Sequence, residues 1–303
     1  MSVSSGIISK RKIQIVLGLL WILDGLLQLQ HQMFSPAFAN KVIDSAGQGQ
    51  AALVTDLVNF ATHIILINPV LFDVMFVAIQ LSIGLLILNK STTKYGLYGS
   101  VFWGISVWIF GEGLGGLTTG HTLLLLGTPG AALLYAIIAL GVNGKLNNRG
   151  EVDKKPAYWL AIIWAVLWLG GSLLQLVNGQ NTAADMSGII SYMAKGSPGW
   201  MASIDTSLAT RVLAWGGWFI IFIIIAQATI GILILFNRRI RLIAIIAGIL
   251  LSAIFWVVGQ NLGDYYSGLM TDPNTGPLVI LLGVAILGSD DRLLARILGD
   301  NKD

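Results

Sequence analysis

The chain contains no cysteine and few charged residues for its length. The missing cysteine excludes disulfide bonds, thiol redox chemistry and thiolate metal ligands. Charged residues make up 11% of the 303 residues and hydrophobic residues 55%, whereas a soluble domain has about 25% charged residues. So few charges cannot cover a folded surface, and most of that surface must face lipid. The composition predicts an all-α integral membrane protein embedded in the lipid bilayer.

Long apolar runs are abundant. A helix formed by such a run can cross a hydrocarbon core of about 30 Å at about 1.5 Å per residue. The runs predict about eight transmembrane helices, at residues 13–33, 69–89, 95–111, 128–143, 157–177, 212–236, 239–258 and 275–288.

The basic residues gather at the ends of these runs and on one predicted side of the membrane. That side has Lys10, Arg11, Lys12, Lys90, Lys94, Lys145, Arg149, Lys154, Lys155, Arg238, Arg239, Arg241, Arg292 and Arg296. The other side has Lys41, Lys195 and Arg211. The positive-inside rule makes the richer side cytoplasmic, which predicts a multi-pass protein of the cytoplasmic membrane with both termini inside. The net charge of +3 is thus a topology signal, and no nucleic acid partner is expected.

The chain repeats itself once. A shift of 147 residues places Trp21, Gln28, Gln80 and Gly84 on Trp168, Gln175, Gln227 and Gly231. A shift of 148 places Trp108, Gly111, Gly115 and Gly120 on Trp256, Gly259, Gly263 and Gly268. Tryptophan, glutamine and glycine rarely match in one register by chance. We therefore predict two tandem four-helix bundles of the same topology, residues 1–147 and 148–303, joined by a polar linker at 144–155.

Each predicted repeat has a long segment on the outer side, at 34–68 and 178–211. Its apolar spacing predicts short helices that cap the bundle. A glycine-rich segment follows the third helix of each repeat, at 111–116 and 259–264. Irregular backbone of this kind needs protein or water to satisfy it at membrane depth. It lacks the preceding strand of a dinucleotide fingerprint.

The layout resembles the DoxX/DoxD group of four-helix membrane proteins. Three stretches carry the resemblance: Gly-Leu-Leu-Trp-Ile-Leu-Asp-Gly-Leu-Leu-Gln-Leu at 18–29, Gln-Leu-Ser-Ile-Gly-Leu-Leu-Ile-Leu at 80–88, and Asp-Pro-Asn-Thr-Gly-Pro at 272–277. The group includes a membrane subunit of thiosulfate:quinone oxidoreductase. The resemblance therefore implies a quinone-linked role with quinone as the cofactor, but it matches no catalytic residue of the family to a position here.

Polar residues inside the apolar runs are the candidate site. Asp24, Gln28 and His31 are spaced to share one face of the first helix. An aspartate near the membrane centre costs at least about 2.5–3.5 kcal/mol to insert, so Asp24 should face the bundle and find a partner, for which Gln80 has the right depth. Glu112 ends the third run. We predict Asp24, His31 and Glu112 as catalytic residues, because reduction of a quinone consumes protons.

Other residues have a structural reading beside the functional one. Gln28 and Gln80, predicted to bind the cofactor, recur in the second repeat and suit interhelical hydrogen bonds equally well. The shift of 147 residues matches Asp24 with Gly171. The repeated fold therefore does not require an aspartate at this position. Trp108 is predicted to line a ring-binding pocket together with Trp103.

Three histidines, all in the first repeat, and a cluster near the end of the seventh run complete the candidates. His31, His63 and His121 lack the tight spacing of a metal site, and no metal is predicted. Asp264, Tyr265, Tyr266 and Asp272 read either as a second polar mouth or as solvated interface residues.

The leading hypothesis is a membrane subunit of a quinone-linked or other respiratory electron-transfer complex, such as one that oxidises thiosulfate or another sulfur compound, working with other membrane subunits. Two alternatives stay open. Duplication and broken segments also fit a transporter or channel for a small solute. The lack of a cofactor motif fits a purely structural subunit of a larger complex.

Overall fold

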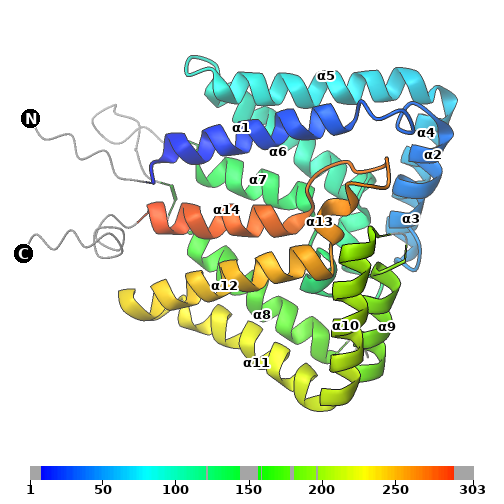
Figure 1. Ribbon diagram of the computed structural model, residues 1–303. Coiled ribbons are helices and arrows are strands. Elements are labelled where there is room, and N and C mark those ends of the chain that lie inside the picture. Colours follow the sequence, from blue (N-terminus) through cyan, green and yellow to red (C-terminus); the bar gives the residue numbers. More distant parts are fainter. Residues whose placement is uncertain are drawn as a thin grey trace, which may run out of the picture.

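Helices form all the regular secondary structure in the part of the chain that the computed structural model describes. That part comprises residues 8–120, 122–143, 156–157, 159–177, 181–195 and 197–289. Eight helices run lengthwise through the molecule (Figure 1): α1 (Lys10–Leu27), α5 (Pro69–Leu88), α6 (Thr93–Phe110), α7 (Ala131–Gly141), α8 (Leu160–Val177), α11 (Gly217–Leu233), α12 (Arg238–Val258) and α14 (Thr275–Gly288).

Shorter helices lie across one end of this bundle (Figure 1). They are α2 (Pro36–Phe38), the π-helix η1 (Ala39–Ile43), α3 (Asp44–Ala46), α4 (Ala52–Ile67), α9 (Ala183–Met193) and α10 (Gly199–Trp215). The prediction of helical caps in the two outer segments is confirmed for their described residues. Short turns complete the connections, namely η2 (Gly113–Gly116), η3 (Leu124–Leu126) and α13 (Asn261–Asp264).

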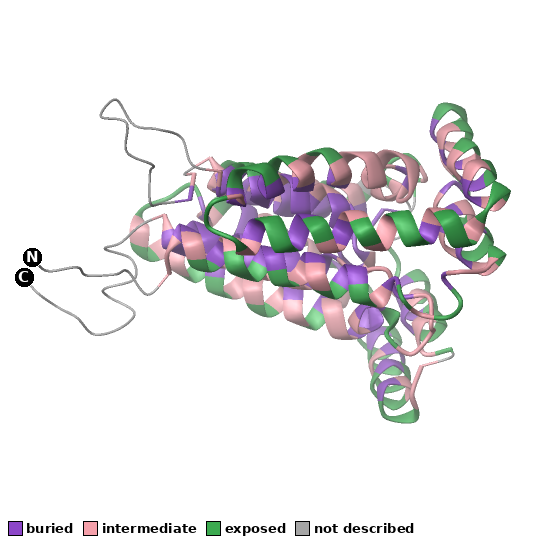
Figure 2. Cartoon of the chain, turned by 90° about the horizontal axis from the view of Figure 1, so that it is seen from above, coloured by how far each residue is buried: buried purple, intermediate pink, exposed green. Residues whose placement is uncertain are grey.

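Two helices, α5 and α12, are each long and apolar enough to cross a membrane. A third span would be formed by α10 and α11 together, which meet at a bend of 103°. Helices α4, α7, α8 and α14 are apolar but shorter. The bundle exposes large apolar side chains such as Leu85 and Phe222 on its outside, which Figure 2 shows as exposed outer faces, as expected of a helical membrane protein. Eight separate spans remain a prediction.

Helix α1 ends earlier than the predicted 13–33. Gln30 donates through Nε2 to the backbone oxygen of Leu27 at 2.8 Å, which caps the last turn of α1. The same amide donates to the backbone oxygen of Met270 at 2.8 Å, which ties the turn to the second half of the chain. These polar contacts end the helix six residues before the predicted limit, at Leu27 rather than residue 33.

Two arginines cap helices at the end of the bundle where α1 begins. Arg11 donates through Nη1 to the carbonyl oxygen of Ile87, at the C-terminus of α5, at 2.8 Å. Arg241 donates through Nε to that of Ile234, just beyond α11, at 3.0 Å. A cation is favourable where a helix leaves its last carbonyl groups unpaired. Arg11 of α1 thus ties α1 to α5, and Arg241 of α12 ties α12 to the end of α11.

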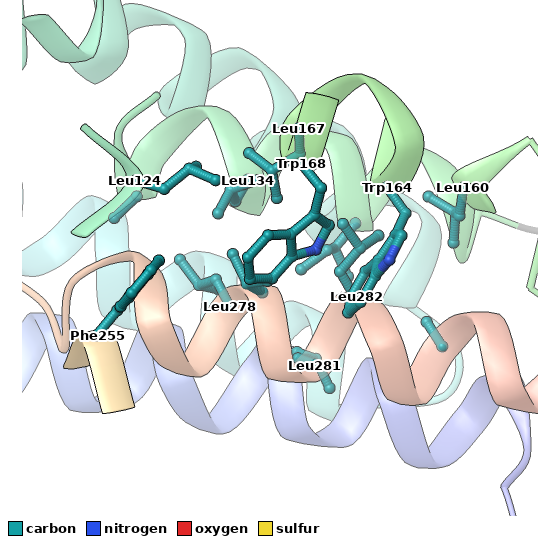
Figure 3. Packing of buried hydrophobic residues seen from close by; sticks show 14 of the residues in the cluster. Leu124, Leu134, Leu160, Trp164, Leu167, Trp168, Phe255, Leu278, Leu281 and Leu282 are labelled. Atoms are coloured by element: carbon teal, nitrogen blue, oxygen red, sulfur yellow. The ribbon is translucent and has the colours of Figure 1, made fainter. Parts of the chain in front are cut away.

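Helices α7 and α14 occupy the centre of the bundle, and α14 is buried along nearly its whole length. A helix that is apolar on all sides belongs in such a position. Trp164 and Trp168 of α8 are buried against Leu278 and Leu282 of α14 in the main core (Figure 3). In a bilayer such burial stabilises the fold through close van der Waals packing, because the lipid tails are as apolar as the core.

The two halves repeat the same contacts. Helix α1 packs on α5 as α8 packs on α11, and α6 packs on α7 as α12 packs on α14. Trp108 Nε1 donates to the carbonyl oxygen of Pro129 at 2.7 Å, and Trp256 Nε1 donates to that of Pro273 at the same distance. Leu114 and Leu262 share a positive φ, 56° and 55°. These pairs support the predicted duplication. Its boundary at 147/148 lies outside the described residues.

Candidate functional site

A cavity of about 240 Å³ lies between the bundle of the first half and its outer helices. Aromatic rings form its walls: Trp21 from α1, Phe38 from α2, Phe76 from α5, and Trp103 and Phe110 from α6. The rings of Phe76 and Trp103 are 5.5 Å apart, centre to centre. Such walls suit a flat, largely apolar ligand. The volume lies below the roughly 300–1,000 Å³ of pockets for drug-sized ligands, so it fits a single ring.

Four acidic or phenolic groups line the cavity, each from a different element. They are Asp24 of α1, Glu112 after α6, Tyr135 of α7 and Asp272 before α14. Asp24 is 2% exposed and Tyr135 is 2% exposed. Asp24 Oδ1, Glu112 Oε2 and the Tyr135 hydroxyl are buried without a hydrogen-bond partner. Unpaired buried polar groups cost about 1–3 kcal/mol each, and their convergence on one cavity indicates a ligand that pairs with them.

The cavity holds negative charge without compensation, because no lysine or arginine lies among the described residues that line it. Burial raises the pKa of Glu112 to about 8, with a further rise from the nearby Asp272. The backbone amide of Ala132 donates to Glu112 Oε1 at 3.0 Å and opposes that rise. Burial also raises the pKa of Asp272. At neutral pH Glu112 is therefore largely a carboxylic acid able to donate a hydrogen bond.

The second half has a counterpart of this cavity that is almost closed, at about 10 Å³. Gln260 stands where Glu112 stands in the first half, and it accepts the corresponding backbone bond, from Gly276, at 2.9 Å. The shift of 144 residues that matches Gly276 with Ala132 also matches Val279 with Tyr135. Gly171 replaces Asp24.

The reason for the closure is visible in the packing. A Cβ at Gly171 would come within 2.2 Å of Leu124 Cδ1, so Leu124 fills the space that a side chain would need. Figure 3 shows Leu124 packed near Trp168 and Phe255. All three acidic or phenolic groups that the first half contributes to its cavity are thus replaced in the repeat, and the fold forms without them.

Each cavity borrows from the other half. Thr271 and Asp272, which precede α14, line the cavity of the first half. Leu124 and Thr128, which precede α7, line the closed cavity of the second half. A hydrogen bond also joins the two halves here, because Gln260 Nε2 donates to the carbonyl oxygen of Leu124 at 3.3 Å. The first-half site is therefore assembled across the duplication.

Of the predicted site residues, Asp24, Gln28, Gln80 and Glu112 line the cavity. His31 does not: it is exposed and lies beyond the end of α1, so it cannot share a helix face with Asp24.

Trp108 is also absent from the lining. Its indole nitrogen is occupied by Pro129, as that of Trp256 is by Pro273. Trp103, five residues earlier on α6 and predicted together with Trp108, does line the cavity.

Gln28 makes a contact that the sequence did not suggest. Its Nε2 donates to Asp73 Oδ1 at 2.6 Å, and both side chains are buried. In the second half Gln227 donates to Gln175 at 2.8 Å, an interhelical hydrogen bond of the kind predicted for these glutamines. The proposed pairing of Asp24 with Gln80 is not formed. Both side chains line the cavity, and Asp24 Oδ1 and Gln80 Oε1 are unpaired.

Two polar residues of the site or its border were missed, and a third was assigned to a different cluster. Asp73 and Tyr135 sit in apolar runs and match Ile220 and Val279 in the repeat, a difference that could have marked them. Asp272 was grouped with Tyr266, but the structure separates them. The Tyr266 hydroxyl lies 2.7 Å from Ser197 Oγ, away from the cavity.

The histidines do not gather. His63 is exposed, and its Nδ1 lies 2.7 Å from the backbone oxygen of Asn59. His121 lies outside the described residues. Within the described part of the chain, no three His, Asp or Glu side chains are placed to hold a metal ion.

Comparison with protein families, with curated proteins and with solved structures found no match.

Proposed function

We propose that this chain is a multi-pass protein of the cytoplasmic membrane with about eight spans, which binds a quinone ring in the cavity of its first half. It serves as the membrane subunit of a quinone-linked electron-transfer complex. One observation carries the proposal. Asp24, Glu112, Tyr135 and Asp272 converge on an aromatic cavity, whereas the closed twin cavity has none of them. The resemblance of residues 18–29 and 80–88 to DoxX/DoxD proteins adds support.

The residues fit a quinone in two respects. Aromatic walls such as Trp103 and Phe76, whose rings are tilted by 50° to each other, suit a flat apolar ring. The carbonyl groups of a quinone accept hydrogen bonds, which Tyr135 and a neutral Glu112 can donate. A quinone held by these residues would supply a two-electron, two-proton acceptor that becomes a quinol. The electrons come from a redox partner subunit, for which a reduced sulfur compound such as thiosulfate is the donor that the resemblance suggests.

The role of this chain is to orient the ring and to handle the protons. Glu112 is held by the Ala132 amide through Oε1, which leaves Oε2 buried without a hydrogen-bond partner. A neutral acid with a raised pKa donates its proton readily near neutral pH. Asp24, deeper along α1, stands within electrostatic range of Tyr135 and Asp272 and accepts or resupplies protons.

Binding of a short-chain quinone to the full chain in lipid nanodiscs tests the proposal. Trp21 and Trp103 line the cavity, so bound quinone should quench tryptophan fluorescence with saturation. Tyr135→Phe and Glu112→Leu, each of which removes a donor from the cavity lining, should each weaken binding about tenfold, equivalent to about 1.4 kcal/mol for one lost hydrogen bond. Gln260→Glu, at the closed cavity, is the matched control and should leave the affinity unchanged. Quenching that is unsaturable, or equal in all variants, would refute the site.

A second candidate is proton-coupled transport of a small apolar cation. Three carboxyl groups without a lysine or arginine beside them, under aromatic rings that attract cations, favour it. Proteoliposomes under a pH gradient decide between the two. Accumulation of N-methylpyridinium, a cation of one ring, that Glu112→Gln abolishes would support transport, and quinone binding without accumulation would support the first proposal.

A further inference from the structure

We propose that Glu112 and Asp272 form an acid pair which holds one proton at neutral pH, and that Asp272, supplied by the second half of the chain, is the positioning residue that keeps Glu112 protonated. The pair would supply the proton donor of the cavity, and that role rests on the proposed function. The existence of the pair can be tested without any ligand.

The surroundings of the two carboxyl groups place the proton on Glu112. Asp272 accepts two hydrogen bonds, from the backbone amide of Asn274 to Oδ1 at 2.7 Å and from Thr271 Oγ1 to Oδ2 at 2.8 Å. Glu112 accepts the Ala132 amide at Oε1, and the Ala131 amide also favours its charged form, but Oε2 is buried and unpaired, whereas both oxygens of Asp272 are paired. Hydrogen bonds to a carboxylate favour its charged form. Asp272 therefore retains the charge, and the proton resides on Glu112 Oε2.

No other group around the pair can neutralise it. The titratable groups that face it are Asp24 from α1 and Tyr135 from α7. The short helices α2, η1 and α4, together with α5 and α6, contribute only apolar or neutral polar side chains to the described lining. No lysine or arginine is among these described residues. Two carboxylates in one poorly solvated site cannot both ionise at low cost.

The twin cavity lacks both members of the pair. Gln260 replaces Glu112, and Thr128 takes the place of Asp272 before the corresponding proline. A glutamine has the shape of a protonated glutamate, and Gln260 makes the same backbone contact as Glu112, to Gly276 instead of Ala132. The second half thus lacks both the aspartate and the glutamate that the aspartate would keep protonated. This joint absence is expected if the two residues act as a pair.

The sequence offers a selective probe, because the chain has only two glutamates, Glu112 and Glu151. The full chain, labelled with ¹³C at the glutamate side-chain carboxyl carbon and placed in nanodiscs, gives two carbon resonances that Glu112→Gln assigns. Titration should show the Glu112 resonance changing with a midpoint near pH 8. Asp272→Asn should move this midpoint down by about one pH unit or more, a tenfold change in proton affinity.

Asp264→Asn serves as the control, since Asp264 lies on the same connection but outside the cavity lining, and it should leave the midpoint unchanged. Asp272→Thr copies the twin cavity and replaces Asp272→Asn if that variant does not fold, as judged by gel filtration. A wild-type midpoint near that of an ordinary glutamate, or a midpoint unmoved by both Asp272 variants, would overturn the pair. If the titration succeeds while quinone fails to bind, the proposed function falls and the acid pair stands.

Discussion

Replacing Glu112 with glutamine should make the protein more stable at alkaline pH. Gln260 shows that a glutamine fits the corresponding site of the second half, where it accepts the Gly276 amide at 2.9 Å. Glu112→Gln should therefore keep the bond from Ala132, which Glu112 accepts at 3.0 Å. What it removes is a carboxyl group that must lose its proton inside a poorly solvated cavity.

The pKa of Glu112 sets the size and sign of the effect. It rises from an ordinary value of 4.5 to about 8 on burial and beside Asp272. The folded protein thus binds a proton that the unfolded chain releases between these pH values, so wild-type stability falls as pH rises through this window. At about 1.4 kcal/mol per pH unit, the loss approaches about 5 kcal/mol above pH 8. Glu112→Gln does not suffer it.

Thermal unfolding in detergent, followed by tryptophan fluorescence at pH 5, 7 and 9, measures the difference. Wild type and Glu112→Gln should unfold at similar temperatures at pH 5 and diverge as pH rises, with the variant the more stable. Asp272 remains in both proteins and contributes equally to each profile apart from its coupling to Glu112. A variant that is less stable at every pH, or a wild-type stability that rises from pH 7 to pH 9, would refute the reasoning.

Three further changes test the scaffold. Trp108→Phe removes the indole bond to Pro129 and should lower stability by about 1 kcal/mol, measured by thermal unfolding. Gly115→Ala should destabilise the protein by about 2 kcal/mol or more, because φ is +62° and a Cβ would meet the oxygen of the same proline at 1.9 Å; Gly116→Ala, with φ +79° but open space, should cost less. Asp73→Asn retains an oxygen for the glutamine amide but removes a buried charge, and should leave a folded, equally monodisperse protein by gel filtration, an outcome that aggregation would contradict.

Much of the fold was within reach of the sequence. Apolar runs located the lengthwise helices to within a few residues, since periodic burial and run length are local properties. The glycine-rich turns were located for the same reason. The end of α1 was missed, because Gln30 ends the helix by a bond to Met270, a contact between distant parts of the chain.

The site was predictable only where a residue stood out within its own run. Asp24 and Glu112 did so, as charges beside apolar neighbours. Asp272 looked like a solvated loop residue, because nothing local shows that its loop crosses to the other half. Trp108 and Trp103 are alike in sequence, and only the bond to a proline carbonyl distinguishes the first as structural.

The exchange of loops between the halves has a consequence for how such a gene could be divided. The lining of each cavity is completed by a loop of the other half. Asp272 of the second half completes the first cavity, and Leu124 of the first half completes the second. A polypeptide ending after the first four lengthwise helices would carry Glu112 without its counter-acid. Fission into two genes would therefore preserve the cavity only if the products met again as a heterodimer, and a homodimer of the first half would place Thr128 where Asp272 now stands.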